Sequence, residues 1–432
     1  MLRIMNSKTV IISLILMKSL NCICQSFKFK LFSPLIKVEK DVPSYVLPNI
    51  LECYDGTIAE TKSEWEKRRM ELLDLFSTYM YGEVPIKQNK IGWEVLCVEE
   101  NAYGGRAIRK DIRIIPIKLY PEYNITVQIY LPPKSKEHPV PIFLALGFHK
   151  NYTVCDDESI DMYKLLGPNG DKNELKNRGS KSNFWNLDLL LERGYGLATF
   201  WHQELVPDTQ EDFINSFPSR FYSRGQHFPL PNEWGMISLW AWQLSRVMDY
   251  IVKDKNIDKK KVIAIGHSRL GKAALWAAAQ DERFAMAVSN NSGCGGAALS
   301  RRRFGENIEA INQRFPQWFC GNYKQFANRE SFMPFDQHEL IGMMAPRPVY
   351  IASSEEDWWS DPLGEFLGGK EANPAYHIYG LPGLECESIP PVGKSVDTGY
   401  IGYHIRRGKH DMTRYDVEQY LNFADKHLKI KP

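Results

Sequence analysis

A serine placed between an apolar strand and a helix is the feature of this sequence that most directly suggests chemistry. Residues 262–276 read Val-Ile-Ala-Ile-Gly-His-Ser-Arg-Leu-Gly-Lys-Ala-Ala-Leu-Trp, so Gly266 and Ser268 lie where the strand turns into the helix. Such a turn lifts the serine hydroxyl above the sheet, beside a helix N-terminus that stabilises a developing oxyanion. The pattern predicts a nucleophile at Ser268. An ordinary turn with a helix-capping serine is the alternative, because the glycine usual two residues after the nucleophile comes one residue later, as Gly271.

Side chains that could activate this serine follow it in the sequence. A serine hydroxyl is a weak nucleophile unless a base removes its proton and an acid orients that base. In hydrolases with this kind of turn, the acid follows the serine and the histidine comes last. An acidic cluster at 355–361 follows an apolar run, and His410 lies in a loop just before the last expected helix. We therefore predict His410 as the base, whereas His404 lies in an apolar run and is interpreted as a core histidine.

The elements that must position these residues alternate along the chain. Short apolar runs predict strands buried on both faces, at 141–146, 195–200, 261–265, 284–289 and 348–353. Helical stretches lie between and after them, at 236–252, 273–280 and 417–428. This alternation predicts a mostly parallel sheet with helices on both faces.

The first part of the chain is expected to extend that sheet. Residues 125–131 alternate apolar and polar side chains, which predicts a half-buried antiparallel strand. A capping box formed by Ser63 and Glu66 predicts a helix that runs to about Tyr81. Together these elements indicate an α/β-hydrolase fold, a three-layer sandwich with a mostly parallel central sheet.

Two connections in this pattern are too long for ordinary turns. Residues 147–194 and 290–346 both follow the carboxyl ends of expected strands, where open α/β folds place their functional sites. Long loops in compact domains are usually functional. We therefore interpret both segments as functional insertions.

The first 24 residues differ from the rest of the chain. Basic residues precede an apolar run at 9–17, and Cys22 and Cys24 follow it. The run is too short to cross a bilayer and predicts a secretory signal peptide at 1–24, with lipidation of one of the two cysteines as an alternative. We expect a single catalytic domain at 25–432, secreted or periplasmic, without an integral membrane span after signal cleavage.

Composition excludes several classes of function. The chain carries 54 basic and 52 acidic side chains, a balance that does not suit a nucleic-acid binder dependent on counterion release. Six cysteines follow residue 24, and they lack the CxxC or Cys/His spacing of a metal site. We expect no nucleic-acid partner, no metal and no cofactor. Export favours one or two disulfide bonds, whose pairing the sequence leaves open.

The residues around the serine resemble those of a known family. Residues 266–272, Gly-His-Ser-Arg-Leu-Gly-Lys, resemble the G-[CH]-S-R-x-G-K motif of glucuronoyl esterases. These α/β-hydrolases cleave the ester between 4-O-methyl-glucuronic acid of xylan and lignin alcohols. The resemblance covers most of the chain after residue 24 and includes further segments at 65–82, 240–246, 292–302, 305–306, 318–320, 357–362 and His410. It implies a serine esterase that forms an acyl-enzyme and acts on glucuronoxylan or lignin–carbohydrate esters. An oligomer is not implied, so we expect a monomer.

The resemblance also implies roles for individual side chains. Ser268 is the expected nucleophile and His410 the base. Arg269 is expected to bind the oxyanion, because its guanidinium adds positive charge where negative charge develops. The side chains that match the sugar contacts of the family are Lys272, Glu306 and Trp359. Without the resemblance, the lysine would be interpreted as solvated and the glutamate as a surface charge. The neighbouring Trp358 is expected to be packed.

The sequence departs from the fungal members of the family at the acid. Where those members carry a glutamate, this chain has Asn291, and an amide cannot stabilise an imidazolium as a carboxylate does. We therefore expect the acid in the later cluster, at Asp357, as in bacterial members. Glu355, Glu356 and Asp361 are the alternatives.

A second departure concerns the cysteines. His267 stands where the fungal members have the cysteine that ties the serine turn to the histidine loop, so that disulfide is absent. We expect Cys294 and Cys320 to pair instead, across the base of the 290–346 insertion.

Two other functions remain as alternatives to a glucuronoyl esterase. One is a carboxylesterase or acetyl esterase for another plant-polysaccharide ester. The other is a non-catalytic carbohydrate-binding protein with a hydrolase fold.

Overall fold

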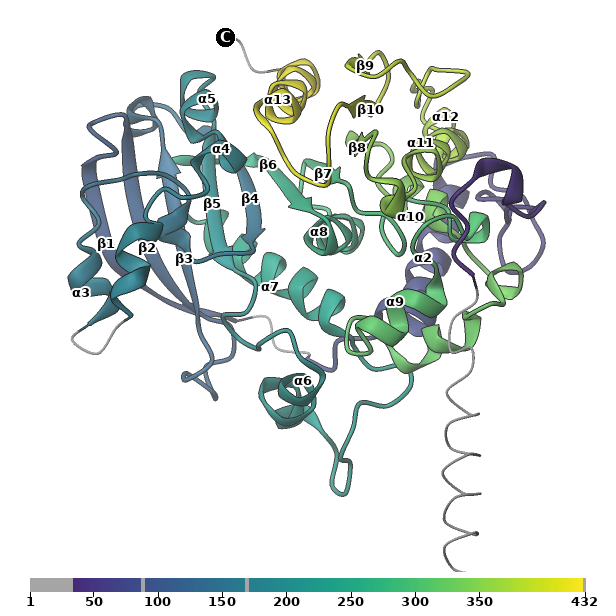
Figure 1. The fold of residues 1–432 in the computed structure, drawn as a ribbon, viewed down its shortest axis with the longest axis horizontal. Helices are drawn as coiled ribbons and strands as arrows, with labels where there is room; N and C mark the ends of the chain where they lie inside the picture. Colours follow the sequence, from purple (N-terminus) through teal and green to yellow (C-terminus); the bar gives the residue numbers. More distant parts are fainter. Residues whose placement is uncertain (1–33, 87–89, 168–170, 430–432) are drawn as a thin grey trace, which may run out of the picture. The chain divides into compact units, whose positions relative to one another are not determined.

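The structure, a computed structural model, describes residues 34–86, 90–167 and 171–429. A ten-stranded sheet forms its centre (Figure 1). The strand order is β1-β2-β3-β5-β4-β6-β7-β8-β10-β9. The strands are β1 (Gly92–Ala102), β2 (Ala107–Ile115), β3 (Ile125–Leu131), β4 (Val140–Gly147), β5 (Gly196–Trp201), β6 (Ile257–His267), β7 (Met286–Asn290), β8 (Val349–Ser354), β9 (Lys394–Val396) and β10 (Ile401–Arg406). Strands β5, β4, β6, β7, β8 and β10 are parallel to one another. The other pairs are antiparallel, including both pairs formed by β3, the strand predicted at 125–131.

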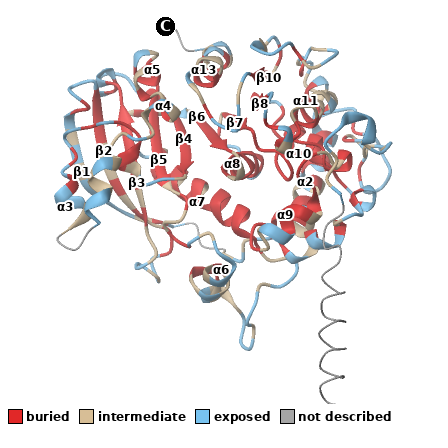
Figure 2. Ribbon diagram, in the orientation of Figure 1, coloured by how far each residue is buried: buried red, intermediate tan, exposed pale blue. Residues whose placement is uncertain are grey.

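Successive side chains of the central strands point to opposite faces of the sheet, and both faces are buried. In β4, Ile142 and Leu144 belong to one apolar cluster, whereas Phe143 and Ala145 belong to another. Figure 2 shows the same burial along the neighbouring strands. Since neither face can be left in water, helices must cover both.

Two groups of helices provide this cover (Figure 1). The helices that contribute to the first cluster include α2 (Lys62–Phe76), α7 (Met236–Ile251), α8 (Arg269–Gln280) and α10 (Gln337–Gly342). The second cluster receives residues from α4 (Ser182–Trp185), α5 (Leu187–Glu192) and α13 (Arg414–Leu428). The other α-helices of the described residues are α3 (Met162–Leu166), α6 (Gln210–Asn215), α9 (Ile308–Arg314), α11 (Pro362–Glu371) and α12 (Asn373–His377). The predicted α/β-hydrolase fold with three layers is confirmed.

The first long helix, α2, begins earlier than predicted. Thr61, rather than Ser63, is the cap: its hydroxyl accepts from the Glu64 N–H at 3.3 Å, and the Glu64 carboxylate accepts from the Thr61 N–H at 2.9 Å. Both possible capping boxes have the right spacing, and the backbone selects the one whose first residue is still extended. The α-helix ends at Phe76 and continues as a π-helical turn, Ser77–Tyr81.

The carboxyl edge of the parallel strands collects the residues singled out above. Ser268 directly follows β6, Asp357 follows β8, and His410 follows β10. The long segments 147–194 and 290–346 begin after β4 and β7 and contain short helices.

The described residues from Ile36 onward form one compact unit. The signal peptide predicted at 1–24 lies outside the described residues. None of the described helices is both long and apolar enough to cross a membrane.

Candidate active site

Ser268 lies in a strained turn between β6 and α8. Its backbone has φ 55° and ψ −129°, a conformation that residues with a side chain rarely adopt and that costs free energy to hold. The Ser268 N–H donates to the Asn290 carbonyl, at the end of β7, at 2.8 Å. Gly266 is required in this turn because a Cβ there would overlap the Leu270 carbonyl. The turn therefore has the geometry of a nucleophile elbow.

His410 and Asp357 come from two different loops and meet in a short hydrogen bond. His410 Nδ1 is 2.6 Å from Asp357 Oδ2. Asp357 is buried, and the Asn291 amide also donates to Oδ2, at 2.9 Å. Burial by itself raises the pKa of Asp357, but the hydrogen bonds from His410 and Asn291 outweigh it and hold this pKa below its usual value. A charged carboxylate on Nδ1 orients the imidazole and leaves Nε2 as the nitrogen that can take a proton.

The other acids of the 355–361 cluster have different surroundings. Asp361 is buried, caps α11 and pairs with Arg302 at 2.8 Å. Glu355 and Glu356 are exposed. Of the four acids in this described segment, Asp357 alone is hydrogen-bonded to His410.

Ser268 and His410 line one cavity of about 280 Å³. The other residues that line it are Phe148, His149, Lys181, Phe184, Trp185, His267, Arg269 and Asp411. The His410 side chain is 38% exposed, so a substrate can reach it. The ring of His267 packs against it with centroids 4.4 Å apart, and burial together with the charge of His410 lowers the pKa of His267 to about 3. His267 therefore remains neutral and adds no charge beside His410.

Arg269 lines this cavity, and its side chain is held in place by Asp208 and Trp318. Its Nη1 donates to Asp208 Oδ2 at 2.8 Å, and its guanidinium lies 4.4 Å from the centroid of the Trp318 ring. Its Nε is buried and has no hydrogen-bond partner among the described residues. A buried donor without a partner is destabilising, and a ligand oxygen would relieve this cost. The arrangement suits the oxyanion role expected for Arg269.

Lys272, Glu306 and Trp359 lie together, outside the residues that line the cavity. Lys272 is buried, and its Nζ donates to the Ser292 carbonyl. Burial raises the pKa of Glu306, although the charges of Lys272 and Arg314 oppose this effect. The Glu306 N–H donates to the Trp359 carbonyl at 2.9 Å, and the Arg314 guanidinium lies 5.0 Å from the Trp359 ring centroid. The structure thus groups the three expected sugar contacts with Arg314, which the sequence does not single out.

Known proteins that are similar in fold and in sequence identify the family. A model of fungal glucuronyl esterases matches residues 191–380. A curated carbohydrate esterase from an unknown prokaryotic organism is 42% identical over 398 residues, which cover 90% of this chain and 91% of that protein. The solved glucuronoyl esterase from Solibacter usitatus is also 42% identical, and the match covers 90% of this chain and 99% of that chain with a TM-score of 0.84. The chain belongs to the glucuronoyl esterase family.

A further solved member of carbohydrate esterase family 15 supports this assignment. It is described as a promiscuous esterase from a marine bacterial metagenome and is 42% identical; the match covers 91% of this chain and 100% of that chain, with a TM-score of 0.82. As a glucuronoyl esterase, the protein is a carboxylic ester hydrolase. The resemblance inferred from residues 266–272 is confirmed, and the roles of individual residues stay predictions.

The disulfide expected in this glucuronoyl esterase does not form. Cys294 and Cys320 are both free and buried, and the other cysteines of the described residues are free as well. Instead, a buried ion pair between Arg301 and Asp336, at 3.2 Å, helps to hold the 290–346 insertion together. Two cysteines near the base of one insertion can still point into different surroundings, which spacing along the chain does not reveal.

Trp358 also differs from expectation. It is 39% exposed rather than packed, and the Lys37 ammonium lies 4.8 Å from its ring centroid. Trp358 and Trp359 open a 3₁₀ turn, Trp358–Ser360, and their rings are inclined at 84° to each other. The turn therefore directs only Trp359 toward Glu306.

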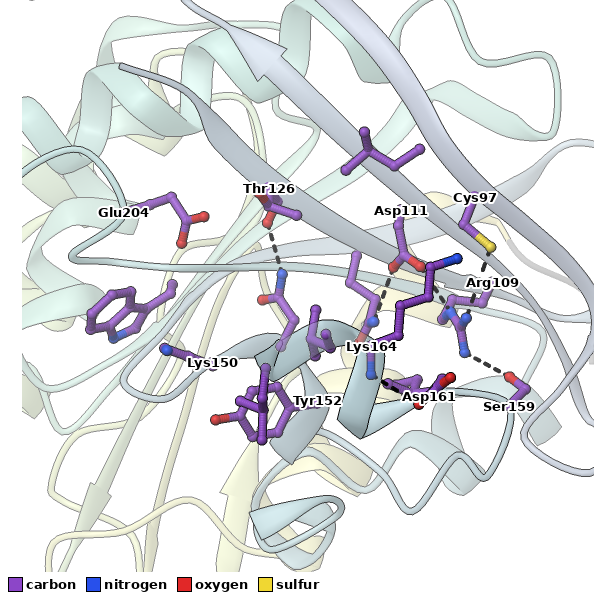
Figure 3. Close-up of a pocket in the computed structure, with 17 residues that line it drawn as sticks. Cys97, Arg109, Asp111, Thr126, Lys150, Tyr152, Ser159, Asp161, Lys164 and Glu204 are labelled. Carbon is purple, nitrogen blue, oxygen red and sulfur yellow. Dashed lines mark hydrogen bonds and ion pairs between the residues drawn. The ribbon is translucent and has the colours of Figure 1, made fainter. Parts of the chain in front are cut away.

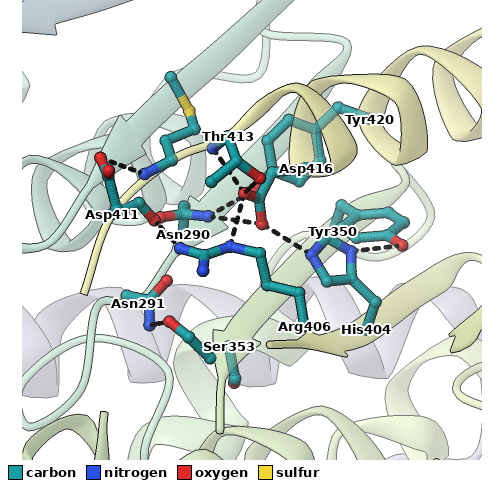
Figure 4. A network of polar contacts seen from close by, with 12 residues as sticks. Asn290, Asn291, Tyr350, Ser353, His404, Arg406, Asp411, Thr413, Asp416 and Tyr420 are labelled. Carbon is teal, nitrogen blue, oxygen red and sulfur yellow. Dashed lines mark hydrogen bonds and ion pairs between the residues drawn. The ribbon is translucent and has the colours of Figure 1, made fainter. Parts of the chain in front are cut away.

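A buried polar network lies beneath the His410 loop of the esterase (Figure 4). Arg406, the last residue of β10, donates to the carbonyls of Arg407, Lys409 and Asp411 at 2.8, 3.0 and 2.5 Å. One guanidinium thus holds the loop that carries His410 at three points. Arg406 is not among the residues that the sequence singles out.

Asp416 holds Arg406 in place. Its Oδ2 accepts from Arg406 Nε at 2.7 Å and from the Thr413 N–H at 2.6 Å, and its Oδ1 is 2.9 Å from His404 Nε2. Burial raises the pKa of Asp416, but His404 and Arg406 outweigh it and keep this pKa below its usual value. His404 is fully buried, so its interpretation as a core histidine is confirmed.

Asn290 connects this network to the serine turn (Figure 4). Its amide donates to the Tyr420 hydroxyl at 2.7 Å and to Asp416 Oδ1 at 3.4 Å, and its Oδ1 is 2.5 Å from His267 Nδ1. Its backbone carbonyl accepts the Ser268 N–H. The turn at Ser268 and the loop that carries His410 are therefore coupled through one set of buried hydrogen bonds.

Proposed function

We propose that this esterase hydrolyses esters of 4-O-methyl-glucuronic acid through an acyl-enzyme on Ser268. The observation that carries the proposal is the 2.6 Å hydrogen bond between His410 and Asp357, beside a cavity that His410 shares with Ser268. His410 Nε2 takes the hydroxyl proton while Ser268 Oγ attacks the ester carbonyl. The tetrahedral intermediate then expels the alcohol, which receives that proton from His410. A water molecule, deprotonated by His410, releases the acid and regenerates Ser268.

The negative charge of the tetrahedral intermediate falls beside Arg269. The Arg269 backbone N–H, next in the chain after the nucleophile, is the usual first donor in such elbows. The unpaired Nε of the same residue supplies a second, charged donor. Because the substrate ester is neutral, this positive charge acts mainly on the transition state.

The proposed substrate is an ester of glucuronoxylan with a lignin alcohol. Lys272, Glu306 and Trp359 are proposed to contact the uronate, because they match the sugar contacts of the family and lie together in the structure. All groups of this mechanism come from one chain, which favours a monomer as the active form.

Export is proposed from the signal-peptide pattern of residues 1–24. Amino-terminal sequencing of the protein recovered outside the cells is expected to begin near residue 25.

Replacement of the nucleophile tests the mechanism. Ser268→Ala is expected to lower kcat on the methyl ester of 4-O-methyl-glucuronic acid by about 10⁶-fold, the usual cost of losing a triad nucleophile. Ser388→Ala, at an exposed serine, is the matched control and is expected to keep wild-type activity. Both variants should unfold at the wild-type temperature. Turnover of Ser268→Ala within tenfold of wild type would remove Ser268 from the mechanism.

The same assay separates the alternative substrates. A glucuronoyl esterase prefers the methyl glucuronate over an aryl acetate in kcat/KM, whereas an acetyl esterase shows the reverse preference. A protein that binds the sugar acid and hydrolyses neither ester would be a carbohydrate-binding protein.

A further inference from the structure

The structure has a second cavity, of about 730 Å³, and none of its lining residues takes part in the proposed mechanism (Figure 3). Side chains of β1, β2 and β3 form its floor, and the segment 150–166, which contains α3, faces them. Trp201, at the end of β5, and Glu204 complete the lining.

The floor of this cavity is polar and mostly paired within itself. Arg109 is buried and pairs with Asp111 at 3.1 Å and with Asp157 at 2.6 Å. Gln128, 5% exposed, donates through Nε2 to Asp111 Oδ1 at 3.0 Å. Its Oε1, in contrast, is buried and has no hydrogen-bond partner among the described residues. This acceptor is available to a ligand hydroxyl, and such a bond would remove the cost of leaving it unpaired.

The rim of the cavity combines an aromatic face with balanced charge. Trp201 is half-buried, and the Lys150 ammonium lies 5.8 Å from its ring centroid. The acidic and basic side chains of the lining are equal in number and are Arg109, Lys150, Lys164, Asp111, Asp161 and Glu204. Without net charge the cavity does not favour an ionic ligand. An indole face beside a floor of hydrogen-bonding groups suits a neutral sugar ring, which has apolar C–H faces and a rim of hydroxyls.

A single loop joins the two cavities. Gly147, the last residue of β4, pairs in register with Trp201. Residues 148–149 then line the catalytic cavity, and residues 150–151 line the second one. Consecutive Cα atoms are about 3.8 Å apart, so the two linings meet within one residue of chain. A ligand that extends from the catalytic cavity past residues 148–149 therefore meets the lining of the second cavity.

We propose that the second cavity is a subsite for a neutral sugar unit of the polysaccharide that carries the ester. Trp201 stacks on the ring, and Gln128 accepts a hydroxyl proton. This inference rests on the proposed function, because it assumes a polymeric carbohydrate in the neighbouring cavity. A phenolic alcohol fits less well, since its ring would cover the ion pairs of Arg109 without replacing the hydrogen bonds of water.

Direct binding of a neutral sugar tests the subsite independently of ester hydrolysis. Xylotetraose, which contains no ester, is titrated into the wild-type enzyme by calorimetry. Trp201→Ala is expected to weaken binding by about tenfold or more, because it removes the stacking surface. Lys150→Ala, at an exposed position, is expected to weaken it less and serves as a variant that does not disturb packing.

Trp93 offers a matched control for the loss of an exposed tryptophan. It is 43% exposed, has the Lys253 ammonium 4.4 Å from its ring centroid, and is not among the residues that line either cavity. Trp93→Ala is expected to bind xylotetraose as the wild type does.

Kinetics supply the second readout. Trp201→Ala should raise KM for an ester on a glucuronoxylan oligosaccharide and leave kcat and KM on methyl 4-O-methyl-glucuronate unchanged. Three results would each overturn the subsite. The first is an unchanged xylotetraose affinity in both Trp201→Ala and Lys150→Ala. The others are equal losses of activity on the two esters in Trp201→Ala, and binding of benzyl alcohol in place of xylotetraose. If glucuronate esters are not hydrolysed but Trp201→Ala still weakens xylotetraose binding, the proposed function fails and the subsite stands.

Discussion

At the scale of single residues, the proposed chemistry depends on which acid reaches His410. The sequence offers four acids within seven residues, and their side chains end in different surroundings. Asp357 is buried against His410, whereas Asp361 is committed to Arg302. Asn291, where the resemblance to fungal members led us to look for an acid, donates to Asp357. The amide thus helps to hold the carboxylate that we propose as the acid.

Removal of the charge at Asp357 tests this assignment. Asp357→Asn is expected to lower kcat by about 10³–10⁴-fold, because an amide neither orients the imidazole in the required tautomer nor stabilises the imidazolium. Glu356→Gln, at an exposed acid of the same loop, is the control and is expected to have little effect. Steady-state kinetics on a glucuronate ester provide the measurement. If Glu356→Gln loses activity and Asp357→Asn keeps it, the acid is Glu356 rather than Asp357.

Two roles can be distinguished for Lys272: contact with the sugar and support of the fold. Its Nζ donates to the Ser292 carbonyl, and burial lowers its pKa. If it binds the uronate, Lys272→Met should raise KM for a glucuronate ester by about 10–100-fold, since a charged hydrogen bond is lost. An aryl acetate, which lacks the sugar hydroxyls, should be hydrolysed as before. Lys260→Met, at an exposed lysine, is the control. Equal losses on both esters would assign Lys272 to the support of the Ser292 loop.

At the scale of elements, the end of β10 and the start of α13 position His410, the proposed base. Arg406 bonds three carbonyls around His410, and Asp416, in the first turn of α13, fixes Arg406. His410 itself is partly exposed, so its position depends on the contacts that hold its loop. The guanidinium geometry matters here, because it offers several donors in one plane.

Replacement of that guanidinium by an ammonium tests the positioning role. Arg406→Lys keeps the charge beside Asp416 but cannot reach three carbonyls at once, so His410 is expected to shift. A misplacement of about 1 Å can cost roughly 100-fold in rate, and kcat should fall by this order while KM stays unchanged. Arg407→Lys, at the exposed neighbour, is the control. A parallel loss of kcat and thermal stability, with an altered KM, would indicate a structural role alone.

At the scale of the whole molecule, Glu365 connects three elements in the interior. It lies on α11, is fully buried, and accepts from Ser353 Oγ at 2.7 Å on β8 and from the Gly293 N–H at 2.9 Å after β7. Burial raises the pKa of Glu365 to about 8. In the unfolded chain the same carboxyl releases its proton near pH 4.3. The folded protein therefore binds one more proton than the unfolded chain between these two pH values, and its stability falls as pH rises through that window.

The variant Glu365→Gln removes this proton and tests the linkage. Its unfolding temperature is expected to fall less between pH 5 and pH 8 than that of the wild type, because the amide has no proton to lose. Glu371→Gln, at an exposed acid on the same helix, should keep the wild-type slope. Thermal unfolding followed by circular dichroism at several pH values supplies the comparison. Identical slopes for Glu365→Gln and the wild type would show that Glu365 is ionised in the folded protein.

The sequence by itself was sufficient for the fold class and the family. Apolar runs such as 141–146 and 261–265 indicate strands buried on both faces, since burial demands continuous apolar side chains. The turn around Ser268 was also readable, because its residues are adjacent and glycine is sterically required beside the serine. Strands β1 and β2 escaped prediction. β1 is largely exposed at the edge of the sheet, and its apolar run at 95–98 is short and flanked by Glu94 and Glu99.

Only the tertiary structure decided which distant side chains meet. Arg406 reaches the His410 loop, Asn291 reaches Asp357, and Cys294 and Cys320 remain unpaired. The Trp201 cavity draws its lining from four strands and an insertion that are separate in the sequence. Local periodicity reports the burial and backbone conformation of neighbouring residues. Pairings between remote residues depend instead on strand order and on the direction of each side chain, which are set only when the whole sheet is assembled.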